Sequence, residues 1–243
     1  MTRSRKIFFM SFSLITIAFL ILSASIVGRF TIKSVEVKEI PETWNIMSLL
    51  LREKGRNMLS LNKRGIKKEI EKLIYIEKAD VTVRDNVLSV TCTLPQCGVL
   101  LYDGTRTAFI GEVEKGEIDS KDYIALQSGF LTLEVTPVLF DIILGSNDEK
   151  YTSLMMTLSH AFESSGLITN AEYDNNKPSI FSGSLTLYLD SVEAVLHIND
   201  LRKVDRLEEC LQIIKEDYIS SKDRMLERAK EYVLDDSLMV VKR

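Results

Sequence analysis

The sequence predicts an α+β protein: an N-terminal transmembrane helix, then a βααββ domain, then a domain of helices packed on a mixed β-sheet. Three patterns support this prediction. Residues 7–28 contain no ionisable side chain, strand-type alternation recurs between residues 30 and 198, and helical apolar spacing separates the groups of strands. We therefore expect a cytoplasmic tail at 1–6, a membrane helix at 7–28, and two further domains at 29–95 and 96–243.

The apolar run near the N-terminus is long enough to cross a bilayer. Its 22 residues span roughly 33 Å as a helix, about the thickness of the hydrocarbon core. Three basic and no acidic residues precede it, which keeps the N-terminus in the cytoplasm and sends the bulk of the chain outside. We expect a single-pass protein of the cytoplasmic (inner) membrane. The anchor residues are Ile7, Phe8, Phe9, Leu14, Ile17, Phe19, Leu20, Ile21, Leu22, Ile26 and Val27.

A cleaved signal peptide is the competing interpretation of this segment. Ser23, Ala24 and Ser25 are small enough for a signal-peptidase site, and basic residues precede either kind of segment. A signal-peptide core usually has about 7 to 15 apolar residues, whereas the run here continues to Arg29. We therefore favour an uncleaved anchor.

Composition places the exterior part of the chain among folded, acidic proteins. After three N-terminal basic residues, 28 Lys and Arg stand against 35 Asp and Glu, a formal charge near −7 that disfavours binding to nucleic acid. The hydrophobic fraction of 45% predicts ordered domains. Cys92, Cys97 and Cys210 have no zinc or redox spacing, so we expect three small buried residues; a turn at Pro95 leaves a pairing of Cys92 with Cys97 open.

The first exterior domain is predicted to begin with a strand from Phe30 to Val37. A helix follows, opened by Glu42 or Thr43 and ended before Gly55, which suits a left-handed position. The expected inner face of this helix consists of Trp44, Met47, Leu50 and Leu51.

A second helix is expected after Asn62, which can cap it. Its inner residues are Ile66, Ile70, Leu73 and Ile74, and its outer residues include Lys63, Arg64, Lys67 and Lys68. We interpret this basic cluster as a solvated helix face, with a patch for an acidic partner or anionic lipid headgroups as the alternative. Two alternating strands, Ile76–Arg84 and Val87–Thr93, follow with a turn at Asp85-Asn86.

The order strand, helix, helix, strand, strand behind one membrane helix resembles a POTRA domain, and specifically that of the FtsQ/DivIB family of bacterial cell-division proteins. Three segments carry the resemblance: residues 30–37 (FTIKSVEV), 55–62 (GRNMLSLN) and 73–84 (LIYIEKADVTVR). In that family a second, mostly β domain follows, and the resemblance implies the same here.

The second domain is predicted to begin with a hairpin of Val99–Tyr102 and Thr107–Ile110 around Asp103-Gly104. Residues 137–145 form a short apolar run with β-branched content. A helix capped by Asn147 and ended by Gly166 is expected next, with Leu154, Met155, Leu158 and Phe162 on its apolar face.

Alternating strands are then predicted at Leu167–Tyr173, Ser184–Leu189 and Val192–Ile198. The last predicted helix has an apolar face of Val204, Leu207, Leu211 and Ile214. The sequence does not specify the order of the strands in this domain.

The C-terminal residues are the candidate partner-binding site. Leu238–Val241 is an apolar, β-prone run, and a terminal strand at a sheet edge offers unpaired backbone groups for strand addition. The family resemblance implies that a partner strand docks in this region, whereas an ordinary core strand is the alternative. The candidate residues are Tyr232, Val233, Leu234, Leu238, Met239, Val240 and Val241.

The sequence offers little for catalysis. His160 and His197 are the only histidines, and no third ligand with metal spacing accompanies them. The adjacent carboxylates Asp235 and Asp236 point apart in a helix or strand, and no phosphate loop or nucleophile motif is present. We therefore expect a protein that is not an enzyme and needs no metal or cofactor.

The resemblance implies a bitopic scaffold of the division septum, part of the divisome. Its partners would be small single-span coiled-coil proteins of the FtsB/DivIC and FtsL type, through which septal peptidoglycan synthesis is regulated. Two other classes stay open: a POTRA-containing component of envelope assembly or secretion, and a periplasmic binding protein with a cleaved signal. The sequence leaves the partner's identity and affinity and the oligomeric state undetermined.

Overall fold

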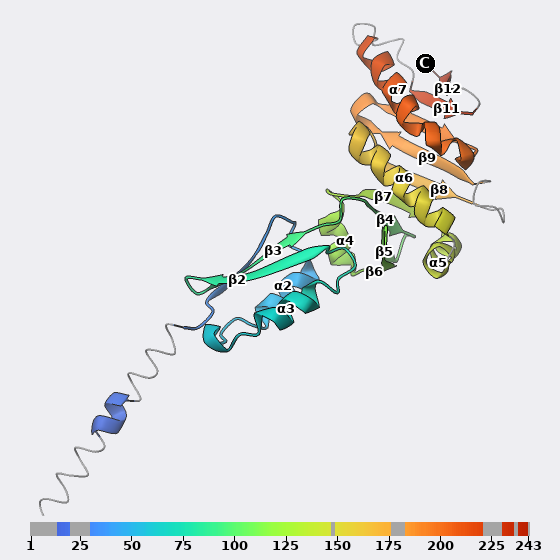
Figure 1. Ribbon diagram of the computed structural model, residues 1–243. Helices are drawn as coiled ribbons and strands as arrows, with labels where there is room; N and C mark the ends of the chain where they lie inside the picture. The colour runs from blue at the N-terminus through green and yellow to red at the C-terminus, as the bar shows by residue number, and fades with distance from the viewer. Residues whose placement is uncertain are drawn as a thin grey trace, which may run out of the picture. The chain divides into compact units, whose positions relative to one another are not determined.

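The computed structural model describes residues 14–19, 30–146, 149–175, 183–220, 230–235 and 238–242. The chain divides into two compact units, Met1–Thr93 (unit 1) and Leu94–Arg243 (unit 2). Figure 1 colours the chain from blue at the N-terminus to red at the C-terminus. Both units combine helices with β-sheet, which confirms the predicted α+β class.

Residues 14–19 are helical and include Leu14, Ile17 and Phe19 of the expected anchor. The other anchor residues lie outside the described part of the chain. Within the residues that are described, no helix combines the length and the apolar character needed to cross a membrane.

Unit 1 is a three-stranded sheet with two helices on one face (Figure 1). Its elements in chain order are β1 (Ser34–Lys38), α2 (Trp44–Leu51), the 3₁₀ turn η1 (Met58–Ser60), α3 (Lys63–Ile70), β2 (Lys78–Arg84) and β3 (Val87–Thr93). The strand order is β1-β3-β2, with β3 parallel to β1 and antiparallel to β2. The central strand β3 buries Leu88, Val90 and Cys92 against the helices.

Several local predictions for unit 1 are confirmed. Asn62 caps α3, and its Oδ1 accepts a hydrogen bond from the Gly65 backbone N–H at 2.9 Å. Gly55 has a φ of 87°, the left-handed conformation expected there. Asp85 and Asn86 have φ values of 53° and 66°, so both central residues of the β2–β3 turn are left-handed.

The predicted inner faces of the two helices need correction. Ile46 and Leu50 are the buried residues of α2, whereas Trp44 and Leu51 are 47% and 48% exposed. Positions four apart lie on one face, so the packing of Ile46 and Leu50 turns the other two toward solvent. Because α3 ends at Ile70, the predicted inner residues Leu73 and Ile74 lie beyond it, in the turn before β2.

Unit 2 is a nine-stranded sheet with helices along it. Its elements are β4 (Gly98–Tyr102), β5 (Thr107–Gly111), β6 (Lys115–Glu117), α4 (Ser120–Leu126), β7 (Leu131–Val135), α5 (Pro137–Gly145), α6 (Glu149–Ser165), β8 (Asn170–Asp174), β9 (Ser184–Leu189), η3 (Asp190–Val192), β10 (Ala194–Ile198), η4 (Leu201–Arg206), α7 (Leu207–Ser220), β11 (Glu231–Leu234) and β12 (Leu238–Lys242). The strand order is β12-β11-β10-β9-β8-β7-β4-β5-β6. Figure 1 shows α6 and α7 side by side along the sheet, and a single apolar core joins these helices to the strands.

The structure confirms the predicted β4–β5 hairpin and the strand at Ser184–Leu189, and Gly166 ends α6 with a φ of 61°. The apolar face predicted for the last helix is buried throughout, at Val204, Leu207, Leu211 and Ile214. Asn147, the predicted cap of α6, lies outside the described residues.

Several elements of unit 2 have no counterpart in the prediction, among them β6, α4, β7 and β11. The apolar run at 137–145 is the helix α5. Thr136 caps it, since its Oγ1 accepts a hydrogen bond from the Leu139 backbone N–H at 3.4 Å, and Pro137 occupies the first turn, where no backbone donor is needed. The cap and the proline outweigh the β-branched content of the run.

Candidate partner-binding edge

β12 is an edge strand of the nine-stranded sheet. It pairs antiparallel with β11, in a register that places Met239 opposite Val233 and Leu238 opposite Leu234. Among the described strands, none pairs with the other side of β12. An edge strand presents a row of N–H and C=O groups to which another strand can add. The C-terminal candidate region therefore lies where strand addition is geometrically possible.

β11 connects the edge strand β12 to the core of unit 2. It pairs parallel with β10, and Tyr232 and Leu234 are buried. The Tyr232 hydroxyl donates a 2.7 Å hydrogen bond to Asp217 Oδ2 on α7. A partner strand at β12 would thus add to a sheet whose penultimate strand is held both by pairing and by a helix contact.

Burial divides the candidate residues of β11 into two groups. Successive residues of a strand point to opposite faces, so Tyr232 and Leu234 face the core and offer a partner no side-chain contact. Val233, between them, is half-buried, and Met239 opposite it is 46% exposed. The remaining candidates, Leu238, Val240 and Val241, lie in β12 itself, where the main chain could pair with an added strand.

A polar row lies beside this edge on neighbouring strands. His197 Nε2 is 3.4 Å from Glu231 Oε1, and His197 Nδ1 is 3.2 Å from Thr186 Oγ1. Sequence inspection placed His197 on a strand but missed Glu231 as its neighbour, because only the parallel pairing of β10 with β11 brings them together. The imidazole is therefore engaged on both nitrogens within the sheet.

The opposite edge of the sheet is shorter and tied to a helix. β6 has three residues, against five in β12. Lys115 Nζ, at the start of β6, donates to the Ile143 carbonyl oxygen at 2.7 Å and also to the Ser146 carbonyl oxygen. Lysine commonly satisfies the last carbonyls of a helix in this way. Of the two edges, β12 is the better template for strand addition.

Cys97 and His160 place a thiol beside an imidazole. Cys97 Sγ lies 3.6 Å from Nδ1 and 3.5 Å from Nε2 of His160. A lone pair on either ring nitrogen points outward in the ring plane, so a thiol bonded to one nitrogen would be much farther from the other. Burial raises the pKa of the Cys97 thiol, and the negative charges of Glu163 and Glu112 raise it further. The pair is thus not arranged as an activated nucleophile and its base.

The other thiols are also poor nucleophiles. Cys92 and Cys210 are buried, as expected, whereas Cys97 is half-buried; all three are free thiols. Burial and then the charge of Glu71 raise the pKa of Cys92 to about 11. Within the described ranges, no group of three or more His, Cys, Asp or Glu side chains is placed to hold a metal ion.

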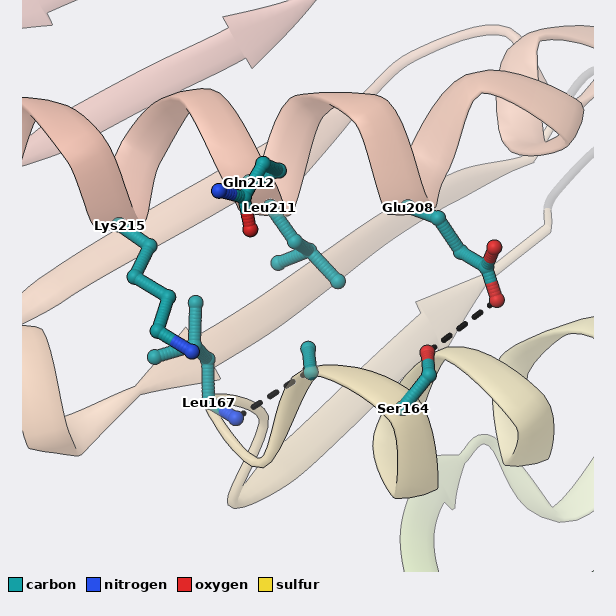
Figure 2. Close-up of a pocket in the computed structure, with 7 residues that line it drawn as sticks. Ser164, Leu167, Glu208, Leu211, Gln212 and Lys215 are labelled. Carbon is teal, nitrogen blue, oxygen red and sulfur yellow. Dashed lines mark hydrogen bonds between the residues drawn. The ribbon is translucent and has the colours of Figure 1, made fainter.

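A pocket lies between the end of α6 and α7, as Figure 2 shows. Its lining residues are Ser164, Ser165, Leu167, Glu208, Leu211, Gln212 and Lys215. The Ser164 hydroxyl donates to Glu208 Oε1 at 3.1 Å, and the Leu167 backbone N–H donates to Ser165 Oγ at 3.2 Å. Both hydroxyls therefore form hydrogen bonds with other residues that line the pocket. Glu208 and Lys215 are its acidic and basic side chains, so the lining favours neither an anionic nor a cationic ligand.

The comparisons with known proteins add no relatives: no family model matches the chain, and no curated protein matches it. The class of protein therefore follows from the fold and the sheet edge alone. It is a two-unit α+β protein in which the C-terminal strand forms a sheet edge on a buried support.

Proposed function

We propose that the protein is a membrane-anchored, non-enzymatic scaffold of the FtsQ/DivIB kind, which holds other proteins at the division septum and so helps regulate septal peptidoglycan synthesis. The observation that carries the proposal is the place of β12 at the sheet edge, beside a strand whose alternate side chains, Tyr232 and Leu234, enter the core. The proposed partners are small single-span coiled-coil proteins of the FtsB/DivIC and FtsL type.

Unit 1 supports the proposal through its element order. Strand, helix, helix, strand, strand is the order that the resemblance implies for a POTRA domain, and β1-α2-α3-β2-β3 has that order. The helices pack on one face of the three-stranded sheet.

Anchoring supplies the mechanism in this proposal. A membrane helix at residues 7–28 would confine the exterior units and their single-span partners to one surface, which raises their effective concentration. Main-chain hydrogen bonds from an added strand then give sufficient affinity without a deep pocket. The scaffold would act by mass action and would need no catalytic step.

The test is co-purification from membranes, with tagged full-length protein beside a version ending at Ser237, which lacks β12. Recovery of small coiled-coil division proteins with the first and not with the second supports the proposal. Recovery with both moves the interface away from β12, and recovery with neither, together with loss of septal localisation, refutes the scaffold function. The intact mass of the mature protein separates an anchored from a cleaved chain.

Proline substitutions test the main chain of β12 specifically. Neighbouring residues of a strand direct their N–H groups to opposite sides, so one of Met239→Pro and Val240→Pro removes an outward donor and the other breaks pairing with β11. Met239→Ala and Val240→Ala are the matched controls. Strand addition predicts that both proline variants lose the partner while both alanine controls retain it; equal loss in the alanine controls would instead indicate side-chain recognition.

A further inference from the structure

One end of unit 1 combines exposed leucines with a dense basic charge. We call residues 51–64 the basic tip; they run from the end of α2 through η1 into α3. Five basic side chains stand there beside a single acidic one, Glu53, which already pairs with Arg56 at 3.0 Å. The basic side chains are Arg52, Lys54, Arg56, Lys63 and Arg64, all of them exposed.

The leucines of the basic tip are unusually open for apolar side chains. Leu59, on η1, is 79% exposed, and Leu51 at the end of α2 is also exposed. The Asn57 side chain holds η1 in place, because its Oδ1 accepts a hydrogen bond from the Leu59 backbone N–H at 2.9 Å. The turn therefore presents Leu59 outward on a fixed backbone. An apolar side chain surrounded by Lys and Arg is typical of a surface that lies in the headgroup region of a membrane.

Hydrogen bonds place the basic tip beside residues 30–32. The Met58 backbone N–H donates to the Phe30 carbonyl oxygen at 2.7 Å, and the Ile32 N–H donates to the Arg56 carbonyl oxygen at 2.9 Å. Phe30 follows the apolar run 7–28 by only two residues. Two residues of extended chain span at most about 7 Å, so a bilayer holding that run lies within reach of the basic tip.

The charges of the two units differ in sign. Residues 30–93 carry 12 basic and 9 acidic side chains, a formal charge of +3, whereas residues 94–243 carry 15 basic and 26 acidic ones, a formal charge of −11. An anionic surface therefore attracts unit 1 and repels unit 2. The positive charge of unit 1 is concentrated in the basic tip and the adjoining part of α3, including Lys67 and Lys68.

We propose that the basic tip is a membrane-docking surface, in which Leu59 enters the headgroup region of the bilayer while the surrounding Lys and Arg side chains bind anionic phospholipid headgroups. The inference rests on the anchor of the proposed function, which brings the tip to the membrane. Docking fixes the orientation of unit 1 on the bilayer, and with it the direction in which the chain continues into unit 2. An acidic protein partner would explain the charge, but not the position of the tip next to the anchor.

The test uses the full chain reconstituted into phosphatidylcholine vesicles, with and without phosphatidylglycerol, and with brominated acyl chains as the quencher. Trp44 is the single tryptophan, so Leu59→Trp combined with Trp44→Phe moves the indole to η1. The unchanged protein is the matched control, because Trp44 lies at the opposite end of α2, about 10 Å along the helix from Leu51. We expect quenching at least about twofold stronger for the relocated indole, and only with phosphatidylglycerol present.

Charge reversal separates electrostatic docking from simple proximity. Lys63→Glu with Arg64→Glu, added to the relocated-indole variant, should abolish the part of the quenching that depends on phosphatidylglycerol, since each basic residue near an anionic surface changes partitioning about fivefold. Lys121→Glu with Lys203→Glu, in unit 2, is the matched control and should leave quenching unchanged. High salt should weaken docking in the same way as charge reversal.

Resistance to alkaline carbonate extraction reports the anchor independently of docking. A chain that resists extraction but shows no stronger quenching at η1 overturns the inference and leaves the anchor standing. A chain that is extracted, yet shows quenching that depends on phosphatidylglycerol, supports docking and refutes the anchor. Equal quenching with and without phosphatidylglycerol overturns the role of the basic side chains.

Discussion

Asp103→Ala is expected to destabilise unit 2 by about 2 to 4 kcal/mol, because one carboxylate organises the β4–β5 turn. Asp103 Oδ1 accepts hydrogen bonds from the Thr105 and Arg106 backbone N–H groups at 2.9 and 2.7 Å, and its Oδ2 accepts one from Arg106 Nε at 2.8 Å. The same guanidinium reaches Asp141 Oδ1 at 2.6 Å and lies 4.4 Å from the centre of the Phe140 ring. The turn is thereby joined to α5.

The pKa of Asp103 sets the pH at which this contribution acts. Burial opposes ionisation, but the hydrogen bonds from Arg106 and Thr105 outweigh it and lower the pKa from 3.8 to about 2. A shift of this size corresponds to about 2 kcal/mol for the ionised carboxylate. Because the folded pKa lies below the unfolded one, the contribution is complete above about pH 4 and disappears as the pH falls toward about 2.

Urea denaturation followed by far-ultraviolet circular dichroism measures the effect. Asp141→Ala is the matched control: Asp141 contacts the same arginine, but its side chain is 66% exposed, so its loss should change stability by less than about 1 kcal/mol. The difference between Asp103→Ala and the unchanged protein should shrink markedly between about pH 7 and about pH 2. Equal effects of the two alanines, or a penalty independent of pH, would refute the reasoning.

Three further predictions concern single side chains. Asn86→Val should destabilise unit 1 by about 1 to 3 kcal/mol in urea denaturation, because a β-branched residue resists the φ of 66°; Asn86→Gly, which adopts that φ but loses the 2.6 Å hydrogen bond from Nδ2 to the Thr31 carbonyl oxygen, should lose less stability. Tyr232→Phe should lose about 1 kcal/mol and speed amide exchange in β11, since its hydroxyl donates at 2.7 Å to a carboxylate on α7; unchanged exchange would contradict this. Brief alkylation at neutral pH should modify Cys97 before the buried Cys92 and Cys210. Peptide mapping that finds all three cysteines equally labelled would contradict the burial of Cys92 and Cys210.

Predictions from the sequence succeeded where the deciding interactions are local. Asn62 caps α3 through a backbone donor three residues away, and Asp85-Asn86 forms a turn between adjacent strands. Prediction was only partly right for the inner face of α2, where apolar residues occur almost all around the helix: Leu50 is buried as predicted, but Trp44 and Leu51 are exposed. Only packing on the sheet selects Ile46 and Leu50 over Trp44. The same limit applies to the candidate site, because burial of alternate residues in β11 follows from its pairing with β10.

The sequence by itself determined the α+β class, the Asn62 cap, the Asp85-Asn86 turn, and the apolar, β-prone character of the C-terminal run, because each depends on residues close together in the chain. The tertiary structure alone decided that β1 lies beside β3 and that β12 is the edge of a nine-stranded sheet. It also decided which leucines remain in solvent at the basic tip. These outcomes depend on pairing and burial summed over segments far apart in the chain, and no local pattern specifies such a sum.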